Sequence, residues 1–296
     1  MPDFTLETSH GIISITDTGL KNDRPALLLL HGNSSSSKIF RHILTSQTLS
    51  SQYRLITFDL PGHGASSNAL HPEKSYTMAG YADLAVHILE HLSVESVIVL
   101  GWSLGGHIAL EMVALLKTAS ERGSRIVELK GLVLTGTPPA LGAEQCAEGF
   151  KINTDPDVEK GEENLMAKVH WTEEQAETIA INSAPGGHPE LYEDWMLKDA
   201  VRTDGKARMV MFDAFVDGRG VDQVGVVEGE DVLIAVINGA DEPFINLDYI
   251  DGLKWRSLWR GQCIRLGSRK HAPFWEDPKG FETLLVNFLE DCSARE

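Results

Sequence analysis

One pentapeptide constrains this 296-residue chain more than any other stretch: Gly101-Trp102-Ser103-Leu104-Gly105. Residues 96–100, just before it, are apolar and β-branched, which predicts a buried strand. Residues 106–116, just after it, carry apolar side chains at helical spacing. A Gly-x-Ser-x-Gly between a strand and a helix is typical of a nucleophile elbow, where a tight turn lifts the serine hydroxyl out of the sheet. We therefore predict that Ser103 is a nucleophile.

The rest of the chain alternates apolar runs with helical patterns, which predicts a parallel sheet covered on both faces. Residues 4–15 resemble an opening hairpin. Further strands are expected at 26–30, 54–58, 131–135, 232–237 and 262–266, and flanking helices at 76–92 and 278–292.

The alternation stops between residues 140 and 225, an acidic stretch with helical patterns at 158–170, 173–182, 189–202 and 204–215. We predict that residues 140–225 form a helical cap inserted in an α/β core. The core would then consist of residues 1–139 and 226–296.

Composition excludes several classes of protein. The formal net charge of −17 disfavours nucleic acid and anionic membranes as partners, and a neutral or cationic small molecule fits better. No apolar run reaches the ~20 residues of a membrane span. The first residues lack the pattern of a secretory signal, and the three cysteines lie far apart. A cytoplasmic protein without a metal or other cofactor is expected.

Polar residues follow several of the predicted strands, at one edge of the sheet. His31 and Asn33 follow the first buried strand, Asp241 and Glu242 a later one, and His271 the last. Hydrolysis of an ester needs a nucleophile, a base, a group that orients the base, and donors to the oxyanion. His271 is the predicted base. Either Asp241 or Glu242 would orient it, since only one of two adjacent residues can point at it.

The order Ser, acid, His along the chain resembles the α/β-hydrolase superfamily. A closer resemblance is to its metal-independent N-acyl-homoserine lactone lactonases, and it extends over nearly the whole chain. It rests on seven segments: 31–36, 59–64, 101–107, 135–139, 202–205, 238–244 and 271–274. The resemblance implies a mostly parallel eight-stranded sheet, a cap, and opening of the lactone ring of N-acyl-homoserine lactones. It also favours Glu242 over Asp241 as the triad acid.

The oxyanion would be bound by the backbone N–H groups of Leu104, after the nucleophile, and Asn33, in the loop after the first core strand. The Asn33 side chain would add a contact to the substrate. Aromatic residues are candidates for lining the substrate pocket: Trp102, Phe244 and Phe274 in the core, and Trp171, Tyr192 and Trp195 in the cap.

Other interpretations stay open. A carboxylesterase or a carbon–carbon bond hydrolase would use the same elbow and triad, because the cap determines the substrate. A ligand receptor on the same fold would bind without turnover. His87-Ile88-Leu89-Glu90-His91 matches a zinc-peptidase motif. We interpret its histidines as a solvated helix face, since no third ligand is apparent.

Overall fold

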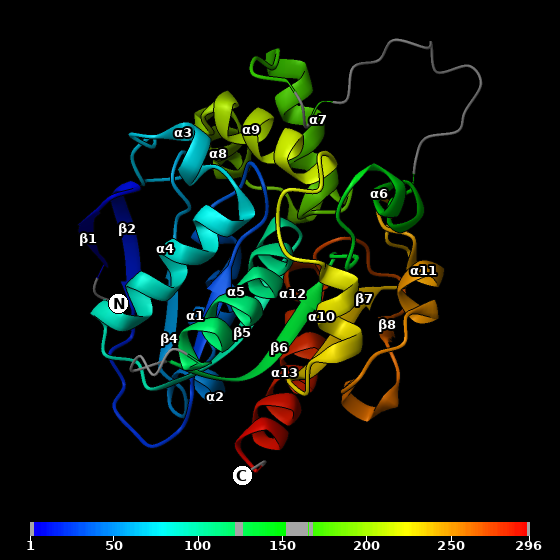
Figure 1. Ribbon diagram of the computed structural model, residues 1–296. Helices are drawn as coiled ribbons and strands as arrows, with labels where there is room; N and C mark the ends of the chain where they lie inside the picture. The colour runs from blue at the N-terminus through cyan, green and yellow to red at the C-terminus, as the bar shows by residue number, and fades with distance from the viewer. Residues whose placement is uncertain (1–2, 122–126, 152–164, 166–167, 295–296) are drawn as a thin grey trace.

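The computed structural model describes residues 3–121, 127–151, 165 and 168–294. Its centre is an eight-stranded sheet with the strand order β1-β2-β4-β3-β5-β6-β7-β8 (Figure 1). The strands are β1 (Asp3–Thr8), β2 (Gly11–Asp17), β3 (Ala26–Leu30), β4 (Leu55–Phe58), β5 (Ser96–Trp102), β6 (Glu128–Thr135), β7 (Leu233–Gly239) and β8 (Ile264–Leu266). The predicted strands and opening hairpin are confirmed.

The strands from β3 to β8 are all parallel, while β1 and β2 form an antiparallel hairpin that joins at β4. All five residues of β3 are buried, because the sheet is covered on both faces. Parallel strands place their carboxyl ends at one edge. The loops after β3, β5, β6 and β7 therefore converge there.

Helices cover the two faces of the sheet (Figure 1). On one face, α4 (Met78–His91), α5 (Leu104–Glu121) and α10 (Gln223–Gly229) pack over a continuous apolar core. A second core on the other face is formed by η1 (Ser37–Phe40), α1 (Arg41–Leu44), α2 (Gln47–Ser50), α12 (Pro273–Glu276) and α13 (Pro278–Ser293). The short helices α3 (Pro72–Ser75) and α11 (Leu247–Gly252) and the turn η4 (Trp259–Gly261) complete the core.

Between β6 and β7 the described residues form helices and loops. They contain α6 (Ala143–Gly149), α7 (Glu173–Ser183), η3 (Pro189–Leu191), α8 (Asp194–Arg202) and α9 (Gly205–Val216). We call residues 140–225 the inserted segment. In Figure 1, α7, α8 and α9 lie together at the top, beyond one edge of the sheet.

Three of the four helices predicted in the inserted segment agree with α7, α8 and α9 to within a few residues. The fourth, predicted at 158–170, lies mostly outside the described residues. Residue 225, the predicted end of the insertion, falls inside α10. Among the described residues, no helix is long and apolar enough to cross a membrane.

Candidate active site

Ser103 lies in the sharp turn between the end of β5 and the start of α5, with a φ of 54°. This left-handed conformation costs a non-glycine residue about 1–2 kcal/mol. The turn also needs glycine on both sides. A Cβ on Gly101 would lie 2.4 Å from the carbonyl oxygen of Gly105, and one on Gly105 only 2.0 Å from that of Leu30. The strained, tightly packed turn is the expected geometry of a nucleophile elbow.

Glu242 and His271 form a buried pair at the same edge of the sheet. The Nδ1 atom of His271 lies 2.8 Å from Oε2 of Glu242, and the two residues are 5% and 1% exposed. The second carboxylate oxygen, Oε1, accepts a hydrogen bond of 2.9 Å from the backbone N–H of Phe244. Asp241, in contrast, is exposed, and its N–H donates to the carbonyl of Arg269.

This pairing determines the tautomer of His271. An ionised carboxylate only accepts hydrogen bonds, so Nδ1 of His271 carries the proton and donates it to Glu242. The Nε2 atom is then left with a lone pair, which is the form that a general base needs.

The ring of His271 is held by aromatic neighbours. Phe244 meets it edge-on with ring centroids 5.0 Å apart, and the Trp102 ring lies 5.6 Å away. The indole N–H of Trp102 also donates to the backbone carbonyl of His271 at 2.9 Å. Trp102 and Phe274 are nearly fully buried and pack against each other. All three core aromatics that were predicted to line the pocket thus pack around the His271 loop.

The end of β6 connects Ser103 to His271. The N–H of Ser103 donates to the carbonyl of Thr135, and the hydroxyl of Thr137 donates to the carbonyl of Ser103 at 2.8 Å. Between these two threonines, Gly136 adopts a φ of 61° and packs so closely on His271 that a Cβ would lie 2.6 Å from Cε1. Ser103 and His271 therefore flank the same short segment.

The loop of Asn33 approaches Ser103 directly. A Cβ on Gly32 would lie 3.1 Å from Cβ of Ser103, so glycine permits this close approach. Leu104 is the first residue of α5, and its backbone N–H has no partner within the helix. The two predicted oxyanion donors thus belong to segments that both adjoin the serine.

Asp59, just after β4, supports the Asn33 loop in a way that the sequence analysis missed. Its carboxylate accepts two bonds of 2.7 Å, from the N–H groups of Ser37 and Ala65. The signal was available, since Asp59 is an acidic residue immediately after a buried strand. Asn238 in β7 is a second supporting residue that the sequence analysis missed. Its Oδ1 accepts a hydrogen bond of 2.7 Å from the N–H of Gly136, the residue that packs on His271.

Two buried histidines lie beside the same loop. Burial lowers the pKa of His31 and places the pKa of His63 well below its ordinary value. His31 accepts from the N–H of Leu60 at Nε2, so its Nδ1 is the protonated nitrogen and donates to the carbonyl of Gly32. Both rings are therefore neutral, and they add no positive charge beside Asn33.

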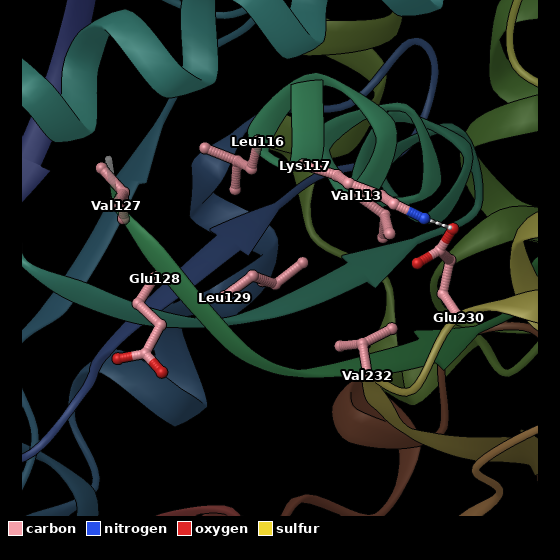
Figure 2. Close-up of a pocket in the computed structure, with 8 residues that line it drawn as sticks. All are labelled: Val113, Leu116, Lys117, Val127, Glu128, Leu129, Glu230 and Val232. Carbon is pink, nitrogen blue, oxygen red and sulfur yellow. Dashed lines mark hydrogen bonds and ion pairs between the residues drawn. The ribbon is translucent and has the colours of Figure 1, made fainter. Parts of the chain in front are cut away.

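The zinc motif and a surface groove both lie apart from this site. His87 and His91 are exposed on α4, and no three metal-ligating side chains gather anywhere in the described part of the chain. A groove of about 420 Å³ lies between the end of α5 and the starts of β6 and β7, with an ion pair of Lys117 and Glu230 at its rim (Figure 2). Ser103 follows the carboxyl end of β5, so this groove is at the opposite edge of the sheet.

The fold and this site together define a class of protein. A family model described as alpha/beta hydrolase fold matches residues 25–176, and the chain belongs to that family. A solved structure of the N-acyl homoserine lactonase AidH, a variant in complex with N-hexanoyl homoserine lactone, is 37% identical with a TM-score of 0.87. The match covers 100% of both chains. The same lactonase in complex with N-butanoyl homoserine aligns equally well, over 100% of this chain and 99% of that one.

Two curated relatives match less well, one in identity and the other in coverage. A pimeloyl-[acyl-carrier protein] methyl ester esterase of Yersinia pseudotuberculosis is 26% identical over 90% of this chain and 93% of its own. The magnesium-chelatase 30 kDa subunit of Rhodobacter capsulatus is 39% identical, but the match spans only 33% of each protein. The chain is thus a hydrolase of the α/β fold with similarity to esterases and lactonases.

Proposed function

We propose that this protein is a serine hydrolase that opens the lactone ring of N-acyl-homoserine lactones. The observation that carries the proposal is the full-length similarity to a lactonase bound to such a lactone. The buried His271–Glu242 pair next to the serine elbow supplies the chemistry. In this proposal, the inserted segment is the cap that covers the active site.

In the proposed reaction the hydroxyl of Ser103 attacks the lactone carbonyl carbon while Nε2 of His271 takes its proton. The carbonyl oxygen becomes an oxyanion, to which the N–H groups of Asn33 and Leu104 donate. The tetrahedral intermediate then collapses and the ring C–O bond breaks. His271 returns the proton to the leaving alkoxide, which stays attached to the acyl group because the substrate was a ring.

The acyl-enzyme is hydrolysed by the same groups in reverse. His271 takes a proton from water, the hydroxide attacks the ester carbon, and the bond to Ser103 breaks with return of the proton to its oxygen. The products are the ring-opened N-acyl homoserine and free enzyme. Glu242 accepts from Nδ1 throughout and stabilises the imidazolium that forms at each proton transfer. We propose no such role for Asp241, because its neighbour occupies the hydrogen-bonding position.

A second candidate is hydrolysis of open-chain carboxylic esters, favoured by the similarity to methyl ester esterases. Both reactions use the same triad and differ in the leaving group. A lactone retains its alcohol, whereas an ester releases it.

A pH-stat assay of proton release separates these candidates. N-Acyl-homoserine lactones of short and long chain are compared with p-nitrophenyl esters, and the S103A variant gives the blank rate. We expect Ser103-dependent lactone opening that is faster than ester cleavage. Ester cleavage without lactone opening would refute the substrate assignment. Binding of lactone with negligible turnover would refute the enzyme and favour a receptor.

A further inference from the structure

A buried carboxylate of the inserted segment is bonded to the loop that carries Asn33. Asp199 lies on α8 and is only 4% exposed. Its Oδ2 accepts a hydrogen bond of 2.5 Å from the hydroxyl of Ser36, which is itself fully buried, and its Oδ1 lies 2.9 Å from Nζ of Lys38. The ion pair and the hydrogen bond both connect α8 to the segment that follows Asn33 by a few residues.

That loop contains a strained residue that needs support. Ser34 follows Asn33 directly and has a φ of 54° without being a glycine. Such a conformation persists only where the surroundings determine it. Asp59 holds one side of the loop through the N–H of Ser37, and Asp199 holds the other through Ser36. The first support comes from the core and the second from the inserted segment.

We propose that Asp199 is a positioning residue, which fixes the Asn33 loop so that its N–H points at the oxyanion. The proposal rests on the proposed function, because it assigns a role in stabilising the same transition state. Under it, the contact of α8 with the core also completes the oxyanion hole. Asp199 does not contact substrate and acts through Ser36.

The same helix offers a matched control. Glu193 precedes α8 and forms a two-fold ion pair with Arg41 at the start of α1. It also accepts from the indole N–H of Trp195 at 2.6 Å. This contact joins the inserted segment to the core, as Asp199 does, but it bypasses the Asn33 loop. Removal of the Glu193 side chain therefore weakens the packing of the inserted segment on the core and leaves the Asn33 loop in place.

The test compares D199A, D199N and E193A with the wild-type protein. Two quantities are measured for each protein. The first is the steady-state rate on N-hexanoyl homoserine lactone and on p-nitrophenyl butyrate, and the second is the rate at which a fluorophosphonate labels Ser103. We expect D199A to lower kcat and the labelling rate about tenfold to a hundredfold, the range for a misplaced catalytic group, with KM changed less than about threefold. D199N keeps an oxygen that accepts from Ser36, so it should recover most of the rate. E193A should keep the wild-type kcat.

Hydrogen exchange of the backbone amides of residues 33–37 provides a readout besides activity. D199A should increase exchange there, and E193A should not. The S36A variant removes the same hydrogen bond from the core side, and it replaces D199A if that variant does not fold. Equal losses of kcat in D199A and E193A, or unchanged exchange at 33–37 in D199A, would overturn the proposal.

Failure of the proposed function gives a different pattern. Wild-type protein that cleaves the ester but not the lactone would refute the substrate alone, and the variants are then compared on the ester. Wild-type protein that neither turns over nor reacts at Ser103 would refute the hydrolase. In that case the exchange at residues 33–37 decides alone whether Asp199 fixes the loop.

Discussion

His107 provides a pH-dependent contribution to stability that can be worked out from its surroundings. It lies on α5, one helical turn after Ser103, and is 6% exposed between the rings of Phe150 and Phe215. Its Nδ1 lies 2.8 Å from Oε1 of Gln223, which also accepts from the N–H of Ala140. Burial lowers the pKa of His107 from 6.5 to about 4, because the charged ring would lose its hydration.

The sign follows from proton binding. Between pH 6.5 and about 4 the unfolded chain binds a proton at His107 that the folded protein does not, so stability falls as the pH is lowered through this window. With these two pKa values, linkage gives a loss of about 2 kcal/mol in unfolding free energy on going from pH 7.5 to pH 5. His31 and His63 add losses of the same sign, since burial lowers the pKa of each.

Urea unfolding of wild-type protein and the H107N variant at pH 7.5, 6 and 5 isolates the contribution of His107. Asparagine keeps a donor near the Nδ1 position but does not titrate, so its own cost is the same at every pH. We expect the difference in unfolding free energy between the two proteins to shrink by about 2 kcal/mol between pH 7.5 and pH 5. H87N, at an exposed position of α4, is the control and should leave the pH dependence unchanged. Parallel pH profiles for wild type and H107N would refute the reasoning.

Two further pairs of substitutions test the proposed triad and the support of its histidine. E242Q should lower kcat about 10³–10⁴-fold, because an amide no longer stabilises the protonated His271. D241N should change kcat less than about twofold. Steady-state kinetics on the lactone measure both variants, and equal small losses of kcat would contradict the assignment of the acid. G136A introduces a Cβ 2.6 Å from Cε1 of His271 at a φ of 61°, so it should lower kcat at least about tenfold, while G229A, where nothing lies within 4 Å, should be neutral. An unchanged kcat in G136A would show that the segment after β6 does not hold His271.

The sheet could be predicted from the sequence because its strands are continuous apolar runs. Residues 26–30 are β3 with identical bounds, and residues 96–100 lie within β5. A parallel strand is buried on both faces, so local hydrophobicity alone reveals it. The short helices α1, α2 and α3 were not predicted, because four residues carry too little periodicity to be recognised.

The site could be predicted in part. The elbow is a local motif, and the structure has the expected strand, turn and helix around Ser103. The residues alone left Asp241 and Glu242 open, because the choice depends on which carboxylate reaches a residue 29 positions further along the chain. The family resemblance favoured Glu242. The supporting roles of Asp59 and Asp199 depend in the same way on contacts between distant segments.

The inserted segment is hydrogen-bonded to three loops of the site, those that carry Glu242, His271 and Asn33. The Nζ atom of Lys151, in the inserted segment, lies 2.5 Å from the backbone carbonyl oxygen of Glu242. Lys270, beside His271, donates from Nζ to the carbonyl of Gly186 in the inserted segment at 2.7 Å. Asp199 reaches the Asn33 loop through Ser36.

These contacts change what variation in the inserted segment is expected to do. A cap that only shaped the pocket would alter KM and the choice of acyl chain when it is substituted, and would leave the rate of bond breaking alone. A segment that is hydrogen-bonded to the loops of the proposed acid, base and oxyanion donor also transmits small displacements to the reacting groups, and kcat is sensitive to displacements of that size. Substitutions at its contacts with the three loops should therefore change kcat, while substitutions that alter only contacts with substrate should change KM.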